Sequence, residues 1–350
     1  MTTGPFREGE ILRGKYRVKR LLGEGGMGIV VLARHLRLDR NVAIKMLSDE
    51  AAAKSGAVVR FAREARAAAR IQSDHVVRIL DVDDSESGAP FLVMEYLEGK
   101  DLDAVLRDEG KLSVARAVDV VLQACVGLAE AHAHGIVHRD LKPANLFLAN
   151  RPGSPGIVKV LDFGISKALR DTDDVALGAT GAERALGSPS YMSPEQLKSA
   201  RHVDARTDIW SLGVTLHELV SGGLPFEAEG ATALGARIAT EPPIPLGRAC
   251  PDAPKELEAI VLRCLEKDPA ARFENVAELA KALAPVSKTG AATAERVHGI
   301  LFAARLSSAR QPIASPSQGP DPRTLSLDAP LLPSPIHAAF LPAIAPRFSR

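Results

Sequence analysis

The stretch that decides the fold is HRDLKPAN at residues 138–145, and DFG follows it at residues 162–164. Asp140 in the first stretch precedes Asp162 in the second by 22 residues. Three features lie upstream: the glycine-rich segment GEGGMGIV at residues 23–30, VAIK at residues 42–45, and the acidic residue Glu64. Each feature is weak evidence when it stands alone, so its local context has to be considered first.

The glycine-rich segment predicts a β-hairpin whose backbone can approach phosphates. A GxGxxG pattern also occurs in dinucleotide-binding folds, but there the glycines open a helix. Here residues 29–34 follow directly and are rich in the apolar and β-branched residues that are typical of a strand. A glycine-rich hairpin without a ligand is the alternative if the segment is taken by itself.

Lys45 and Glu64 are predicted to form a pair. In a strand over residues 41–47, period-two alternation puts Ala43 and Lys45 on one face, and a small residue beside a cation suits an adenine ring and its phosphates. Residues 57–72 carry apolar residues at helical spacing, and Glu64 shares their buried face. A charge on a buried face needs a partner, and Lys45 is the natural one.

With all five features present in this order, the sequence resembles the protein kinase family from residue 16 to about residue 284, and in particular the bacterial eukaryotic-like Ser/Thr kinases. The resemblance implies an α+β, bilobal kinase fold, with a β-rich N-lobe over residues 16–97 that contains one key helix. The larger, helical C-lobe would span residues 98–284. Helical patterns at 113–134, 208–221, 254–265 and 276–283 agree with such a lobe, and Ser113 is a suitable N-cap for the first.

The resemblance also implies the activity of an ATP-dependent serine/threonine protein kinase, which transfers the γ-phosphate of ATP to Ser/Thr hydroxyls of proteins in bacterial signal transduction. Asp140 would be the catalytic base and Lys142 would face the γ-phosphate, while Asn145 and Asp162 would hold Mg²⁺. Lys45, positioned by Glu64, would contact the α- and β-phosphates. The full set of implied ATP-binding residues is Leu22, Gly23, Glu24, Gly25, Gly26, Met27, Gly28, Ile29, Val30, Ala43, Lys45, Glu64, Glu95 and Leu97.

The same resemblance assigns structural roles to residues that would otherwise be ordinary surface charges. Asp208 would brace the backbone of the catalytic loop, and Arg272 would pair with Glu195. His132, His134 and His138 could suggest a metal site, but residues two apart on a helix do not face together, so a shared ion is not expected. His138 would instead be the catalytic-loop histidine that packs against Phe163. Two departures from the family pattern, Ser193 in place of alanine and Ser188 in place of threonine, keep a small residue and a hydroxyl and leave these roles intact.

The segment after Asp162 is predicted to be regulatory. It is long and irregular for a loop inside a compact domain. Arg139 lies beside the catalytic acid, and a phosphate on the loop would supply the countercharge that Arg139 needs. We therefore expect autophosphorylation at Thr180, with Thr172 as the second choice, and a homodimer is a possible arrangement for its transfer in trans. A merely flexible loop is the alternative, above all for Thr172.

Composition sets limits on the chain as a whole. Its 350 residues carry 44 Lys+Arg against 43 Asp+Glu, a net charge of +1 that gives no field to hold nucleic acid. Apolar runs are shorter than the roughly 18 residues of a membrane helix, and three widely spaced cysteines suit a reducing, cytoplasmic setting. Residues 1–15 are taken as an N-terminal extension. Residues 285–350, with ten prolines and eight serines, are predicted to be a mostly disordered tail.

Two other functions stay open at this point. A pseudokinase scaffold would bind nucleotide without turnover. This alternative is weakened because the residues expected for catalysis are all present: Lys45, Glu64, Asp140, Asn145 and Asp162. A small-molecule kinase would share the two lobes, but Lys142 and residues 187–195 resemble a peptide-docking arrangement. Nucleotide binding without phosphotransfer would indicate the scaffold, and a screen of small hydroxyl compounds would identify the small-molecule kinase.

Overall fold

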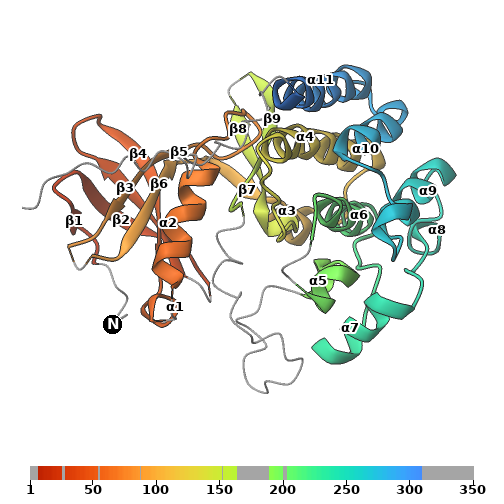
Figure 1. The fold of residues 1–350 in the computed structure, drawn as a ribbon, viewed down its shortest axis with the longest axis horizontal. Coiled ribbons are helices and arrows are strands. Elements are labelled where there is room, and N and C mark those ends of the chain that lie inside the picture. The colour runs from red at the N-terminus through yellow and green to blue at the C-terminus, as the bar shows by residue number, and fades with distance from the viewer. Residues whose placement is uncertain are drawn as a thin grey trace, which may run out of the picture. The chain divides into compact units, whose positions relative to one another are not determined.

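The fold was analysed in a computed structural model of the chain, which describes residues 7–25, 28–53, 56–86, 88–151, 153–163, 189–199 and 203–309. All of these residues belong to one compact unit that ends at Ala309. Within this unit a six-stranded sheet with α1 (Asp49–Ala52) and α2 (Ala57–Ala68) is built from the residues up to Glu95, and a larger lobe that is mostly helical follows it in the sequence (Figure 1). This confirms the predicted α+β, bilobal fold.

The N-lobe is an antiparallel six-stranded sheet of order β1-β2-β3-β4-β6-β5. Glycines at the β2–β3 connection let the two strands pair as far as Gly25 and Gly28, as the predicted hairpin requires. The sequence analysis did not predict β5, because its three aspartates interrupt the apolar residues that are typical of a strand. The bounds are β1 (Ile11–Leu12), β2 (Tyr16–Gly25), β3 (Gly28–His35), β4 (Arg40–Leu47), β5 (Ile79–Asp84) and β6 (Pro90–Glu95).

Side-chain alternation in β4 divides the N-lobe into two small cores. Val42 and Ile44 pack with the β2 and β3 residues on one face, and Ala43 packs on the other. Helix α2 (Ala57–Ala68) lies across this second face and buries Phe61 and Ala65 there (Figure 1). The helix ends four residues before the predicted boundary at residue 72, because the chain turns at residues 69–70 and sends Ile71 into the core of the C-lobe.

The C-lobe is built around α4 and α6, which are buried along most of their length. Ser113 accepts a hydrogen bond from the Arg116 amide and caps α4, as predicted. A small sheet of β7, β8 and β9 leads the chain into Asp162. The bounds are β7 (Gly99–Asp101), α3 (Leu102–Glu109), α4 (Val114–Ala133), β8 (Leu146–Arg151), β9 (Ser154–Val160), α5 (Pro194–Lys198), α6 (Arg206–Ser221), α7 (Ala231–Thr240), α8 (Leu246–Ala249), α9 (Lys255–Cys264) and α10 (Val276–Leu283).

The prediction of a disordered tail from residue 285 was wrong for its first part. Residues Gly290–Ala309 form helix α11, which packs on α4 and α10 and buries Val297 completely (Figure 1). Composition averaged over residues 285–350 misled the analysis, because nine of the ten prolines lie at or beyond residue 312. The compact unit therefore extends to residue 309, and residues 310–350 lie outside the described part. No helix of the described part is long and apolar enough to cross a membrane.

Candidate active site

The loop of residues 138–145 brings the three predicted catalytic residues together. A 3₁₀ turn at Pro143–Asn145 folds Asn145 back toward Asp140. Its amide nitrogen donates to the Asp140 carbonyl at 2.7 Å and to the Asp140 carboxylate at 3.1 Å. The Lys142 ammonium contacts the same carboxylate oxygen at 3.2 Å. A carboxylate with a neighbouring ammonium is thus fixed at a partly exposed position.

A buried carboxylate braces this loop from below. Asp208, on the first turn of α6, is fully buried and accepts the backbone amides of His138 at 2.9 Å and Arg139 at 2.8 Å. Burial alone would raise the pKa of Asp208, but the hydrogen bond and charge of His132, the charge of His138 and the Arg139 amide hold it below its ordinary value. The predicted bracing role is confirmed, and His132 belongs to it at 2.8 Å, which the sequence analysis did not anticipate.

Lys45 reaches Asp162, not Glu64. Its ammonium lies 2.7 Å from the Asp162 carboxylate, and both side chains are largely buried. Burial would raise the pKa of Asp162, but the charge and hydrogen bond of Lys45 lower it. The ion pairs among the described residues do not include the expected one between Lys45 and Glu64. Helical periodicity predicts which face of α2 carries Glu64, but it cannot identify which acid contacts Lys45.

The wall above this ion pair comes from the N-lobe sheet. Ala43 and Lys45 share a face of β4, as predicted, and Met94 of β6 lies opposite Ala43. Gly28 is required by close packing, because a Cβ atom there would meet the Met46 carbonyl oxygen of β4 at an impossible 1.9 Å. Gly26 and Met27, at the tip of the glycine-rich segment, lie outside the described residues.

The donor set suits a magnesium ion. Among the described residues, both hydrogen bonds of the Asn145 side chain are made by its nitrogen, which leaves the amide oxygen available as a ligand. The backbone amide of Leu161 donates to the Asn145 carbonyl at 2.9 Å, so Asp162 follows directly beside Asn145. Within the described residues no three His, Cys, Asp or Glu side chains form a metal site of their own. Magnesium is usually held in this way, by few protein oxygens together with substrate phosphates.

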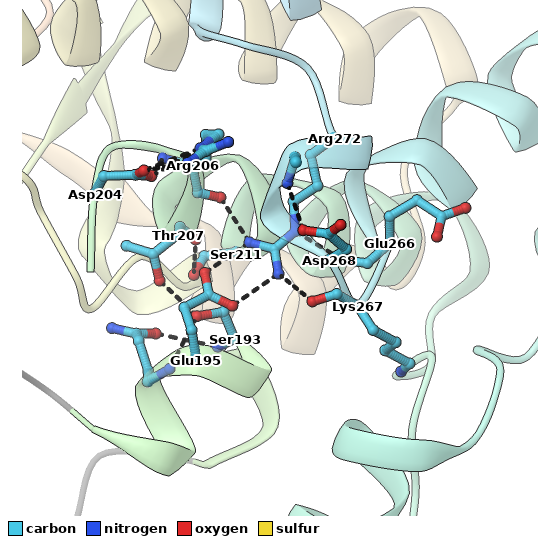
Figure 2. Close-up of polar contacts among 12 residues, drawn as sticks. Ser193, Glu195, Asp204, Arg206, Thr207, Ser211, Glu266, Lys267, Asp268 and Arg272 are labelled. Atoms are coloured by element: carbon cyan, nitrogen blue, oxygen red, sulfur yellow. Dashed lines mark hydrogen bonds and ion pairs between the residues drawn. The ribbon is translucent and has the colours of Figure 1, made fainter. Parts of the chain in front are cut away.

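A second ion pair holds the segment of residues 189–198. Arg272 has a fully buried side chain and donates to both oxygens of Glu195, at 2.7 and 2.8 Å (Figure 2). Ser193 starts α5 with a capping box, and Gln196 donates to the Arg139 carbonyl at 2.9 Å. The predicted pairing of Arg272 with Glu195 is confirmed, and Gln196 connects this segment to the catalytic loop.

The predicted regulatory residues divide between described and undescribed parts. Thr172 and Thr180 lie outside the described residues, as do Gly164, Gly187 and Ser188. Arg139 is half-buried, and its guanidinium has no hydrogen-bond or ion-pair partner within the described part of the chain. The ring centroids of His138 and Phe163 are 4.9 Å apart, which confirms the predicted contact between these two side chains.

This arrangement of two lobes around Asp140, Asn145, Lys45 and Asp162 agrees with a match to the model of the protein kinase domain over residues 16–283. The chain belongs to the protein kinase family. Among the kinases that resemble it, the serine/threonine-protein kinase Pkn3 of Myxococcus xanthus is 42% identical over 266 residues, which is 75% of this chain and 48% of that protein. PknB of Mycolicibacterium smegmatis is 37% identical over 289 residues, 82% of this chain and 45% of that protein.

The chain thus spans about half the length of these kinase relatives. Its fold is also similar to the crystal structure of the PknI kinase domain of Mycobacterium tuberculosis, with a TM-score of 0.63 and 28% identity. That similarity covers 80% of this chain and 98% of the PknI chain.

Proposed function

We propose that this chain is an ATP-dependent protein kinase that phosphorylates serine and threonine hydroxyls of proteins. The observation that carries the proposal is the contact of Lys142 and Asn145 with one carboxylate oxygen of Asp140. This cluster supplies a proton acceptor and a cation at one point. The protein kinases Pkn3 and PknB, which are named for serine and threonine, support the choice of hydroxyl.

Each residue then has a step that its position supports. Asp140 orients the substrate hydroxyl and accepts its proton, and Lys142 stabilises the negative charge on the transferred phosphoryl group. Lys45 binds the α- and β-phosphates, and the backbone of Glu95 and Leu97 binds the adenine edge beside Ala43. Asn145 and Asp162 would hold Mg²⁺, which neutralises charge on the phosphates.

The test is phosphotransfer from labelled ATP with Mg²⁺ by the purified protein, with labelled sites mapped by mass spectrometry. We expect Asp140→Asn to lower the rate by about 10²–10⁴, the usual contribution of a general base. Asp252→Asn, at an exposed acid away from the site, is the matched control and should retain the wild-type rate. ATP binding without label in the wild type would favour the scaffold, and transfer to small hydroxyl compounds alone would favour a small-molecule kinase.

Regulation and setting form a second part of the proposal. Phosphate on Thr180, or on Thr172, would pair with Arg139, whose guanidinium lacks a partner within the described residues. A homodimer would allow this transfer in trans, and the site of action would be the cytoplasm. Unchanged activity in a Thr172→Ala/Thr180→Ala double variant would contradict the regulatory part and leave the catalytic part standing.

A further inference from the structure

Lys159 lies beside the segment that connects the two lobes, at a junction formed by Glu95, residues 76–78 and β9. It lies on β9, three residues before Asp162. Its ammonium contacts the Glu95 carboxylate at 2.8 Å and donates to the Val76 carbonyl at 3.3 Å. Only 12% of its side chain is exposed. A lysine buried to this degree on a strand is held for its contacts and not for solubility.

Glu95 is tied from both sides at this junction. It is the last residue of β6, directly before the connection to the C-lobe. The carboxylate oxygen that contacts Lys159 also accepts the backbone amide of Arg78 at 2.8 Å. The Glu95 amide in turn donates to the Arg78 carbonyl at 3.0 Å. The side chain of Glu95 therefore links the interlobe connection to the segment before β5.

The backbone of β9 holds the segment between α2 and β5 as well. Val160 accepts the Val77 amide at 3.0 Å and donates to the His75 carbonyl at 2.9 Å. Gly127 of α4 permits this approach, because a Cβ atom there would lie 2.5 Å from the His75 oxygen. These backbone bonds fix residues 75–77 to β9, and the bonds between Arg78 and Glu95 extend this connection to the end of β6. The Lys159 side chain adds a direct contact between β9 and the Glu95 carboxylate.

We propose that Lys159 is a positioning residue that fixes residues 95–97 relative to Asp162 and so pre-organises the nucleotide site. The inference rests on the proposed function, in which residues 95–97 bind adenine and Asp162 lies at the phosphates. Three segments meet at one ammonium: the interlobe connection, the segment after α2, and strand β9, which ends two residues before Asp162. Holding them before binding lowers the ordering cost that the nucleotide would otherwise have to meet.

The structure also provides a matched control. The Glu95–Lys159 pair forms part of the wall of an open cavity of about 380 Å³, and Arg151 lines the same cavity. Arg151 is exposed, and within the described residues its guanidinium makes no hydrogen bond or ion pair. Replacing Arg151 removes a cation from the same cavity without breaking the junction.

The experiment compares Lys159→Met, Lys159→Arg and Arg151→Met in the full chain. In Lys159→Met we expect KM for ATP to rise roughly three- to tenfold, the effect of one weakened hydrogen bond, with kcat within about twofold. Lys159→Arg should restore KM in large part, because its guanidinium keeps the charge and the donors. Arg151→Met should match the wild type. An unchanged KM, a loss confined to kcat, or higher activity in Lys159→Met would overturn the proposal.

Hydrogen exchange gives a readout that needs no catalysis. Amides of residues 76–78 and 95–97 should exchange faster in Lys159→Met than in wild type, while those of α6 should not change. Equal exchange at both segments would overturn the positioning role even if KM changed. If the wild type failed to bind ATP, the proposed function would fall, and the exchange data would still decide whether Lys159 holds the junction.

Discussion

At the scale of single residues, the site contains two residues whose backbone conformation is rare for any residue other than glycine. Arg139 has a φ of 66° and Asp162 a φ of 55°, both in the left-handed region. The surroundings over-determine both residues. Asp208 and Gln196 hold the amide and carbonyl of Arg139, and Lys45 holds the carboxylate of Asp162. Strained backbone conformations are common where function requires a fixed geometry. Here one directly precedes Asp140 in the sequence, and the other is at Asp162.

Arg272 allows a prediction about stability at the same scale. Its guanidinium is fully buried and also donates to the carbonyls of Arg206 and Glu266. Arg272→Met would leave the Glu195 carboxylate largely buried without its partner, at a cost of about 3–5 kcal/mol in the free energy of unfolding. Urea unfolding at neutral pH measures the loss. Lys281→Met, at an exposed lysine of α10, serves as the control and should unfold like the wild type.

The same ion pair should give stability a pH dependence. Burial would raise the pKa of Glu195, but the hydrogen bond and charge of Arg272 lower it below the ordinary 4.5. Its contribution to stability is therefore complete above about pH 4.5 and is lost as the pH falls through the folded-state pKa. Arg272→Met should lack this part of the acid slope. A variant that kept the full wild-type slope would show that Glu195 is stabilised by something other than Arg272.

How far the sequence predicts these residues depends on whether a motif fixes them. Asp208 and Arg272 make the contacts predicted for them, and Asp140 lies beside Asn145, because each belongs to a motif with a fixed spacing. The predicted partner of Lys45 was Glu64, and the ion pair in the folded lobes is with Asp162. Lys159 gave no signal at all, because a single lysine in a strand is ordinary, and its two partners are 64 and 83 residues away.

At the scale of elements, periodicity predicts the elements that pack on the N-lobe cores. Side chains of β4 alternate between the two cores, and the helical spacing in α2 marks one buried face; both elements form, although α2 ends at Ala68 and not at residue 72. The spacing does not predict β5, because Asp81 and Asp83 interrupt its apolar residues. The Tyr16 hydroxyl, at the start of β2, donates to Asp81, and the Lys15 ammonium, directly before β2, donates to Asp83. α11 was missed because prolines further along the chain dominated the averaged composition.

Helix α11 should contribute measurably to the stability of the C-lobe. Val297 is fully buried against α4 and α10, whereas Phe302 on the same helix is 55% exposed. Val297→Asp would bury an unpaired carboxylate and lose about 1.5–3 kcal/mol of apolar burial in addition. We expect a clear fall in melting temperature for this variant and almost none for Phe302→Asp. Equal melting temperatures for the two would mean that α11 does not stabilise the lobe.

At the scale of the whole described unit, the cores of the two lobes are unequal. One continuous cluster runs through α4, α6, α9 and α10, and it extends to α11. The N-lobe has two much smaller clusters, one on each face of a single sheet. Local stability follows the density of buried apolar contacts. The proposed nucleotide site therefore lies between the more stable C-lobe, which holds Asp140 and Asn145, and the less stable N-lobe, which holds Lys45.

This inequality predicts a pattern of amide hydrogen exchange. Without nucleotide, amides of β2, β3 and β4 should exchange at least about tenfold faster than those of α4 and α6, because the smaller cores open more readily. A non-hydrolysable ATP analogue at about 100 times its dissociation constant stabilises the bound state by about 2.7 kcal/mol. That gain should appear chiefly as slower exchange in the N-lobe, since its opening breaks the site while the C-lobe core is already protected. Equal exchange in both lobes, or slowing confined to α4 and α6, would contradict the inference that the N-lobe opens more readily than the C-lobe.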